Sequence, residues 1–267
     1  MIKQIDYKKT YKYWNRSSGQ VKARPYSSGY LIPAELENIA YYRFKKELEF
    51  LNTFGKFGGK YLDIGCGTGN FLYEWRNKFD LLVGIDFSKP LTKIAKERCK
   101  RFRHIKIFTG NVLNFEKYLN KNDKFKFIFI GGCLMYLNDE DTSGLLKKLY
   151  LHLQNDGVLI FREPTVSEKR IYENQKNYTG IRRTIEEYKN LARLNGKVCA
   201  LNHYQNYAYD YAFIISFYCK AFPFLNNKIR IFENAIIEFL LLFVPLKIYT
   251  LLKGNMILSH FLLIEKR

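Results

Sequence analysis

A hydrophobic stretch of the chain ends in an acidic residue and runs directly into three glycines at alternate positions. Within residues 61–70, Asp63 is followed by Gly65, Gly67 and Gly69. Glycine tolerates positive φ angles and carries no side chain, so a ligand can lie directly on such a loop before a helix begins. The dinucleotide fingerprint G-x-G-x-x-G is not met, because position 70 is Asn. This spacing weakens the case for a bound pyrophosphate.

Two further polar residues follow hydrophobic stretches in the same way. Asp86 ends residues 81–86, and a carboxylate there can accept hydrogen bonds from both hydroxyl groups of a ribose. Asn111 follows residues 104–110, where a polar side chain can meet an adenine amine while the apolar Val112 packs on the ring. Ligands of open α/β sheets bind at the carboxyl ends of the strands, so we expect these residues to share one site with the glycine loop.

Together these residues resemble the class I S-adenosylmethionine-dependent methyltransferases, whose D-x-G-x-G-x-G loop is matched by Asp63, Gly65, Gly67 and Gly69. The resemblance covers about residues 36–161. It implies a seven-stranded sheet with an antiparallel last strand, and S-adenosyl-L-methionine bound across the ends of the first four strands. The cofactor-binding residues that it implies are Asp63, Gly65, Cys66, Gly67, Gly69, Asp86, Phe87, Asn111, Val112 and Gly131.

The resemblance also implies a role for most of these residues. Asp63, Gly65 and Cys66 would line the methionine part, and Asp86 would hold the ribose. Phe87 would stack near the adenine, which Asn111 and Val112 would flank. Family members often have Asp where Asn111 stands, but the Asn side chain still offers an acceptor to the adenine amine.

The fourth hydrophobic stretch ends in residues 131–136, which in the family's geometry face the methyl group. The D/N-P-P-Y motif of enzymes that methylate exocyclic amino groups of bases is missing, and Cys133 follows Gly132 rather than the Pro of cytosine C5 enzymes. DNA methylation therefore loses support, and we expect Cys133 to be a small apolar residue at a strand end.

Three residues are candidates for a catalytic base: His203, Glu163 and Tyr136. His203 ranks slightly ahead because imidazole titrates near neutral pH. Each has a structural alternative: His203 as a hydrogen-bonded strand-end residue, Glu163 as a loop anchor before Pro164, and Tyr136 as part of the cofactor-site floor.

Aromatic residues gather in two regions that we expect to form the acceptor pocket, an N-terminal arm and residues 204–255. Such side chains suit sugars, planar metabolites and unstacked bases alike. The leading hypothesis is methylation of an oxygen or nitrogen of a small molecule, such as a sugar-linked or lipid-linked metabolite. The alternatives are an RNA or protein N-terminal methyltransferase and a non-catalytic cofactor-binding partner subunit. The aromatic residues are Tyr11, Tyr13, Trp14, Tyr26, Tyr30, Tyr204, Tyr207, Tyr209 and Tyr211.

The elements that must position these residues alternate between strand-like and helix-like patterns, which predicts an α/β fold. We expect a Rossmann-like seven-stranded mixed sheet with helices on both faces, plus an N-terminal helical arm and a helical insertion before the last strand. We expect strands at 60–64, 81–86, 104–110, 125–132, 157–163, 197–203 and 259–267, and helices at 34–54, 70–78, 90–101, 139–153 and 183–196, the last capped by Thr184 and ended by Gly196.

We predict a single methyltransferase domain over residues 1–267. It would comprise an N-terminal arm and helix (1–55), the cofactor-binding core (56–203), a helical substrate-side insertion (204–255) and the last strand (256–267).

Composition sets the limits within which these hypotheses lie. The 267 residues are 47% hydrophobic and 26% charged, with a formal net charge of +19, which excludes a disordered or fibrous chain. The charge favours phosphate, nucleic acid or anionic lipid, but a coding bias toward Lys, Asn, Ile, Tyr and Phe explains it equally well. With no recognisable RNA-binding module, a nucleic-acid partner is possible but not favoured.

Five scattered cysteines without a C-x-x-C pair or clustered His predict neither disulfides nor a metal site. The N-terminus lacks a secretory signal, so we expect a cytoplasmic protein. Glu238, Pro245 and Lys247 interrupt the apolar segment 235–252, which argues against a membrane-spanning helix; a kinked half-buried helix or a peripheral membrane or lipid contact are the two alternatives.

Overall fold

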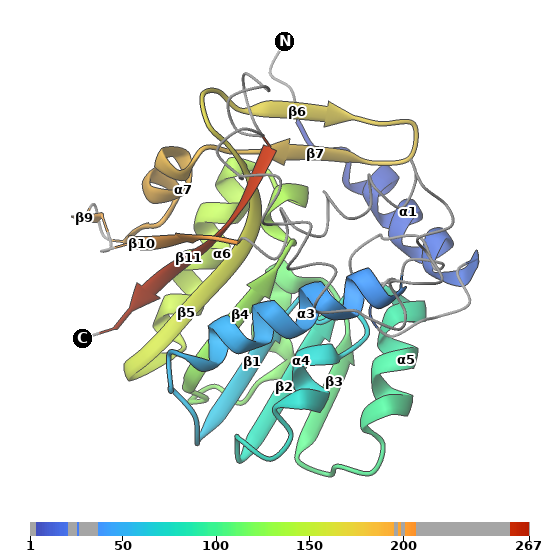
Figure 1. The fold of residues 1–267 in the computed structure, drawn as a ribbon, viewed down its shortest axis with the longest axis vertical. Helices are drawn as coiled ribbons and strands as arrows, with labels where there is room; N and C mark the ends of the chain where they lie inside the picture. Colours follow the sequence, from blue (N-terminus) through green and yellow to red (C-terminus); the bar gives the residue numbers. More distant parts are fainter. Residues whose placement is uncertain are drawn as a thin grey trace, which may run out of the picture.

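The computed structural model describes residues 4–20, 26, 37–194, 197–198, 201–206 and 257–266. A seven-stranded sheet in the order β10-β11-β5-β4-β1-β2-β3 crosses the molecule (Figure 1). Strands β1 to β5 are parallel, and β11 is antiparallel to both β5 and β10. The predicted fold class, including the antiparallel last strand, is confirmed. The strands are β1 (Lys60–Ile64), β2 (Leu81–Asp86), β3 (Ile105–Thr109), β4 (Phe125–Gly131), β5 (Leu153–Val166), β10 (Leu201–Gln205) and β11 (Ile257–Glu265).

The central strands are buried on both faces, as their continuous apolar sequences require. One face carries aliphatic side chains of β1 and β2 against α6 (Asp139–Leu151), α7 (Ile185–Leu191) and the 3₁₀ helix η2 (Val112–Tyr118). Leu62, Ile64 and Leu145 belong to this core and are at most 2% exposed.

The opposite face is mainly aromatic and is covered by α3 (Glu37–Asn52), α4 (Asn70–Glu74) and α5 (Lys89–Cys99) (Figure 1). Tyr61 stacks on Phe79 at 5.2 Å between ring centroids, and Trp75 packs edge-on against Tyr61 at 5.0 Å. These contacts fix the lower part of β1, and the sheet thereby holds the glycine loop at the upper end of the same strand.

Several elements differ from the sequence-based expectations. Helix α4 ends at Glu74 rather than Lys78, and α7 ends at Leu191, after which β8 (Arg193–Leu194) and β9 (Lys197–Val198) form a short hairpin in place of the rest of the predicted helix. The expected strand 197–203 is thus divided between β9 and β10.

Two elements lie at the carboxyl ends of the parallel strands: a helix in the predicted N-terminal helical arm, whose bounds were not predicted, and a hairpin that was not predicted at all. Helix α1 (Tyr7–Gln20) forms in the basic arm, and β6 (Ile171–Asn174) pairs with β7 (Thr179–Arg182) in a polar hairpin. Figure 1 shows both on the same side of the molecule, and the backbone N–H of Asp6 donates to Thr179 Oγ1 at 2.8 Å. The helix and the hairpin therefore cover the end of the sheet together.

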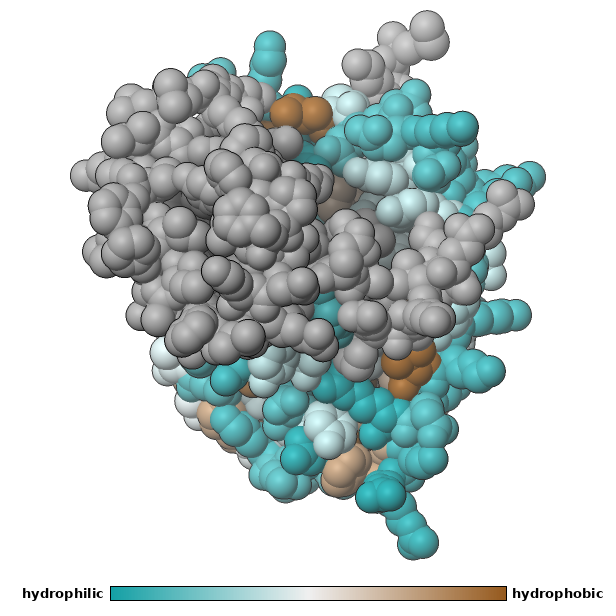
Figure 2. All heavy atoms as spheres, turned by 45° about the vertical axis from the view of Figure 1, so that its right-hand side comes forward, coloured by the Kyte–Doolittle hydropathy of each residue, from teal (hydrophilic) through white to brown (hydrophobic). Residues whose placement is uncertain are grey.

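The predicted insertion 204–255 lies almost entirely outside the described residues. The same holds for Tyr30, Tyr207, Tyr209, Tyr211 and the apolar segment 235–252. Among the helices that the structure describes, none combines the length and apolar character that crossing a membrane requires. The described surface in Figure 2 is mainly hydrophilic, with hydrophobic residues lying singly.

Candidate functional site

The loop after β1 has the open backbone that its sequence predicts. Gly65, Gly67 and Gly69 have φ angles of 75°, 52° and 74°, a region in which other residues are strained. A Cβ atom on Gly65 would lie 3.2 Å from the Cβ atom of Cys133, so the loop also lies close to the end of β4. The main chain is therefore exposed toward whatever binds between these two strands.

Asp86, at the end of β2, is tied to this loop. Its carboxylate accepts the N–H of Gly67 at 3.0 Å and that of Ser88 at 2.8 Å. The side chain is nearly fully buried, and this burial raises its pKa to about 6. Burial likewise raises the pKa of Asp63 to about 8, and the nearby carboxylate of Asp86 adds to the rise. The two acidic residues thus lie near each other at neighbouring strand ends.

A cavity opens at the carboxyl ends of the parallel strands, and a smaller pocket adjoins it beneath the glycine loop. Seven of the predicted site residues line the main cavity, namely Gly65, Gly67, Asp86, Phe87, Val112, Gly131 and Tyr136. Asp63 and Cys66 line the smaller pocket, which shares Gly65, Gly67 and Gly131 with the cavity.

Two predicted cofactor residues are not among the described lining residues. Gly69 is the N-cap of α4, and a Cβ atom there would lie 3.0 Å from Ala95 Cβ, so this glycine allows α4 to approach α5 closely. Asn111 is exposed, and its Oδ1 accepts the N–H of Leu113 at 2.9 Å as the N-cap of η2. Both residues shape elements beside the cavity.

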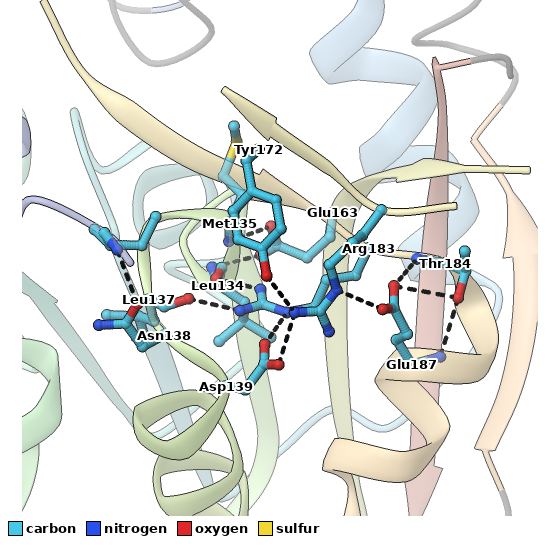
Figure 3. Close-up of polar contacts among 12 residues, drawn as sticks. Leu134, Met135, Leu137, Asn138, Asp139, Glu163, Tyr172, Arg183, Thr184 and Glu187 are labelled. Carbon is cyan, nitrogen blue, oxygen red and sulfur yellow. Dashed lines mark hydrogen bonds and ion pairs between the residues drawn. The ribbon is translucent and has the colours of Figure 1, made fainter. Parts of the chain in front are cut away.

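The floor of the cavity is the turn after β4, which contains the 3₁₀ helix η3 (Leu134–Tyr136). The fully buried carboxylate of Glu163 accepts the N–H groups of Cys133, Leu134 and Met135 at 2.9, 2.9 and 3.2 Å. These bonds fix the path of the turn from the side of β5 (Figure 3).

Arg183 holds the same turn from the other side. Its guanidinium donates to the carbonyl oxygens of Leu134 and Leu137 at 3.0 and 2.6 Å and to Asp139 Oδ1 at 2.8 Å (Figure 3). The side chain is completely buried. Glu163 accepts from backbone N–H groups of the turn, and Arg183 donates to backbone carbonyl oxygens, so the turn is held mainly through its backbone.

The three candidate bases occupy different environments. Burial raises the pKa of Glu163 to about 7, but its oxygen atoms are taken up by the turn and it does not line the cavity within the described set of residues. Tyr136 lines the cavity, and burial raises its pKa well above the ordinary value.

His203 is placed differently from the expectation. It is exposed on β10, the edge strand, and β11 separates β10 from β5. Its ring lies 6.0 Å from that of His260, and it is not among the described residues that line the cavity. The sequence locates the strand but not its position in the sheet, which explains the difference.

Helix α1, in the N-terminal arm that was expected at the pocket, covers the side of the cavity next to Phe87 and Ser88. Tyr11 stacks on Phe87 at 5.7 Å, and Ser88 Oγ donates to the carbonyl oxygen of Trp14 at 3.0 Å. Trp14 also lines the cavity and packs edge-on against Tyr136 at 5.7 Å. The basic arm is thereby part of the site.

A buried ionic cluster borders the cavity near the glycine loop. Glu47 of α3 accepts hydrogen bonds from Arg43 at 2.8 Å, from Arg162 and from Asn206 at 2.8 Å. Burial alone would raise the pKa of Glu47, but Arg162, Arg43 and Asn206 together lower it to about 2. Arg43 and Arg162 both line the cavity. Neither arginine was predicted as a site residue. The only signal in the sequence was a basic residue inside a predicted packed helix, at Arg43, and inside a predicted core strand, at Arg162.

Metal-binding residues do not gather in this part of the chain. Within the residues that the structure describes, no group of three or more His, Cys, Asp or Glu side chains could hold a metal ion.

Comparison with known proteins shows what the core of the chain is similar to. Residues 62–157 match the model of a methyltransferase domain family. A segment of 116 residues is 34% identical to the carboxy-S-adenosyl-L-methionine synthase of Helicobacter pylori (strain HPAG1), covering 42% of this chain and 46% of that protein. The synthase of Campylobacter hominis is 32% identical over 159 residues, covering 54% of this chain and 64% of the relative. The match thus spans about half the length of these relatives.

Solved structures share the fold at low sequence identity. A S-adenosylmethionine-dependent methyltransferase from Leishmania major matches with a TM-score of 0.57 and 19% identity, covering 69% of this chain and 70% of that chain. Phosphoethanolamine N-methyltransferase 2 of Haemonchus contortus, in complex with S-adenosyl-L-methionine, matches with a TM-score of 0.60 and 13% identity, covering 95% of this chain and 60% of that chain.

Proposed function

Because its core is a class I S-adenosylmethionine-dependent methyltransferase domain, we propose that this chain is an enzyme that transfers a methyl group from S-adenosyl-L-methionine to an oxygen or nitrogen of a small molecule. The observation that carries the proposal is the exposed glycine backbone beside Asp86 at the carboxyl ends of β1 and β2. This arrangement suits a nucleoside with a free diol.

The described residues fit the cofactor part by part. The backbone of Gly65 and Gly67 would receive the methionine part and the ribose, with Asp86 accepting from the diol. Phe87 and Val112 would bracket the adenine from the two sides of the cavity. Asp63 and Cys66 would border the methionine part from the smaller pocket.

The cofactor supplies an activated methyl group on a positively charged sulfur, and the chain supplies proximity and a dry surface. Trp14 of α1, together with Met135 and Tyr136 of the turn after β4, forms an apolar wall of the cavity. This wall would exclude water from the reacting atoms. Of the three candidate bases, Tyr136 alone lines the cavity among the described residues. Because its raised pKa keeps it protonated, we assign it a hydrogen bond to the acceptor rather than proton abstraction. Glu163 is assigned to holding the turn.

The test is direct. Calorimetry with S-adenosylhomocysteine should show one site per chain, and a methyl-labelled cofactor should label a small-molecule fraction of a cell extract. A chain that binds neither S-adenosylhomocysteine nor S-adenosylmethionine contradicts the proposal. Binding without labelling of any fraction would favour a non-catalytic partner subunit, and labelled RNA with a steep loss of affinity in added salt would favour an RNA substrate.

A second candidate function is carboxy-S-adenosyl-L-methionine synthesis. The identity of 34% to the Helicobacter pylori synthase over 116 residues supports it. Mass spectrometry of the nucleoside products distinguishes the two: methyl transfer yields S-adenosylhomocysteine, whereas the synthase reaction yields a nucleoside with an added carboxyl group.

A further inference from the structure

Four aromatic side chains form a closed ring of contacts at the cavity, which we call the aromatic box: Tyr13, Trp14, Tyr136 and Tyr178. The ring centroids of Trp14 and Tyr136 lie 5.7 Å apart at an interplanar angle of 86°, and those of Tyr136 and Tyr178 lie 5.8 Å apart at 76°. Tyr13 completes the ring, with centroid distances of 5.6 Å to Trp14 and 5.2 Å to Tyr178. All of these residues except Tyr13 are among the described residues that line the cavity.

The aromatic box is assembled from three separate elements. Helix α1 supplies Tyr13 and Trp14, η3 supplies Tyr136, and the turn between β6 and β7 supplies Tyr178. The hydroxyl group of Tyr178 donates to Glu173 Oε2 at 2.9 Å, which fixes this ring from the hairpin. The sides of the box are therefore positioned by the protein before a ligand binds.

The charges beside the aromatic box are compensated. Arg182 lines the cavity, and its Nε donates to Glu173 Oε1 at 2.6 Å, so this guanidinium already has its counter-ion. Burial raises the pKa of Tyr136, and the carboxylates of Glu173 and Glu163 add to the rise. These acidic groups make the potential at the Tyr136 hydroxyl more negative, which favours a cation there over an anion.

None of the three candidate bases is placed, within the described part of the chain, to accept a proton at the aromatic box. His203 is absent from the described lining of the cavity, and the oxygen atoms of Glu163 are bonded to the turn after β4. Tyr136 stays protonated because of its raised pKa. The acceptor that suits this site is therefore one that can attack without giving up a proton to the enzyme.

A neutral amine is such an acceptor, and this step of the argument rests on the proposed function. Its nitrogen attacks with its own lone pair, the new bond to the methyl carbon forms, and the sulfur–methyl bond breaks with its electron pair going to sulfur. The positive charge thereby passes from the sulfur to the nitrogen. An amine that arrives as an ammonium ion first gives its proton to the solvent, whereas a hydroxyl group would need a base at the moment of attack.

We propose that the acceptor is an alkylamine and that the aromatic box binds its nitrogen centre, stabilising the ammonium cation that methyl transfer creates. Aromatic rings attract an alkylated ammonium group through their quadrupole, and the attraction is stronger where water is excluded. The box lies on the turn after β4, which in the proposed function faces the methyl group, so the charge develops next to its rings.

The test uses the full chain saturated with S-adenosylhomocysteine and titrated with tetramethylammonium chloride at constant ionic strength. Isothermal calorimetry should detect binding of this cation, and tert-butanol, a neutral molecule of similar size, should bind at least fivefold more weakly. If tert-butanol binds as well as tetramethylammonium does, the box is an apolar surface only and the amine assignment is wrong.

Substitutions in the box test whether its rings hold the cation. Tyr178→Leu and Trp14→Leu should each weaken tetramethylammonium binding at least fivefold, whereas Tyr178→Phe keeps the ring and should change it less than twofold. Tyr150→Leu removes a ring of α6 that is not among the described lining residues, and it should leave the binding unchanged. The two leucine variants lie on different elements, so a folding defect in one leaves the other as the test.

Affinity for S-adenosylhomocysteine separates the possible failures and shows which variants fold. If the wild-type chain binds S-adenosylhomocysteine but not tetramethylammonium, or if the folded leucine variants bind the cation as well as Tyr150→Leu does, the amine assignment is wrong while the methyltransferase proposal stands. If S-adenosylhomocysteine itself fails to bind, both proposals fall.

Discussion

Asp86 combines a structural and a proposed binding role in one buried carboxylate. It joins the N–H of Gly67 to that of Ser88, so it links the glycine loop to the start of α5. A residue so placed holds the loop in the shape that the ligand needs before the ligand arrives. Its contribution to binding can therefore be measured separately from its contribution to stability.

We expect Asp86→Ala to weaken S-adenosylhomocysteine binding more than tenfold, because the variant loses the acceptor for the ribose hydroxyls. Isothermal calorimetry gives the affinity and circular dichroism checks the fold. Asp80→Ala, just before the other end of β2, is the control and should retain the wild-type affinity. Unchanged affinity in Asp86→Ala would remove this residue from the site.

Glu163 offers a second prediction at single-residue scale. Glu163→Gln replaces one of the two acceptor oxygens with a donor, which then faces N–H groups of the turn. Leaving buried donors unsatisfied should lower the free energy of unfolding by about 1–3 kcal/mol at pH 7. Urea denaturation measures this. Glu186→Gln on exposed α7 surface should cost far less.

Close contact between elements also sets the distance of α4 from the sheet. A Cβ atom on Gly84 in β2 would lie 2.5 Å from Leu72 Cδ1 and 2.9 Å from Cys66 Sγ. Real Cβ atoms do not approach other atoms this closely, so a larger residue there requires the side chains of Leu72 and Cys66, or the helix and loop that carry them, to shift.

We therefore expect Gly84→Ala to destabilise the protein by about 1–3 kcal/mol and to weaken cofactor binding as well. Gly144→Ala in α6 is the matched control, since nothing lies within 4 Å of its added Cβ atom. That substitution should instead stabilise the helix by about 0.5–1 kcal/mol. Thermal unfolding and calorimetry of both variants check the pair, and equal effects would show that the contact at Gly84 is easily relieved.

The elements that sequence predicted well are those whose own residues determine them. Strands β1, β2 and β4 are continuous apolar runs, and their positions were predicted within a residue or two. The bounds of helix α1 were missed because its sequence is strongly hydrophilic and basic. Its contacts are with distant residues such as Thr179 and Asn138. The hairpin β6–β7 was missed because its sequence is polar and its position depends on the same contacts.

The whole molecule should show the effect of its buried carboxyls in its pH dependence. The pKa values of Asp63, Asp86 and Glu163 are raised to about 8, 6 and 7. A raised acidic pKa means that the folded state holds the proton more tightly than the unfolded state, so the stabilisation is full at low pH and is lost as pH rises toward the folded value. The pKa of Glu47 is lowered to about 2, so its ionised form stabilises the folded state. This stabilisation is lost as pH falls below about 4.5.

We expect the free energy of unfolding of the wild type, relative to Glu163→Gln, to fall as pH rises from 4.5 to 7. Urea denaturation at several pH values measures the difference, and Glu186→Gln provides the reference. A difference that is constant or rises with pH would show that folding does not raise the pKa of Glu163.

At this largest scale, the sequence predicted the cavity residues that follow strand ends more completely than those that come from other elements. The glycine loop, Asp86 and Phe87 each follow a strand end directly, so knowledge of the strands was sufficient to bring them together. Trp14 was expected at the pocket as part of the N-terminal arm. Arg43 and Arg182 were not, because they reach the cavity from α3 and β7, whose packing on the sheet cannot be read from local patterns. His203 failed for the same reason, because its edge-strand position is a property of the sheet order.

Glu163 and Arg183 anchor the turn after β4 through its peptide groups. The side chains of Cys133, Met135 and Tyr136 in this turn line the cavity instead. Backbone anchoring of this kind leaves those three positions open to replacement without rebuilding the loop. A library restricted to them would be the economical starting point for redirecting the enzyme toward new acceptors.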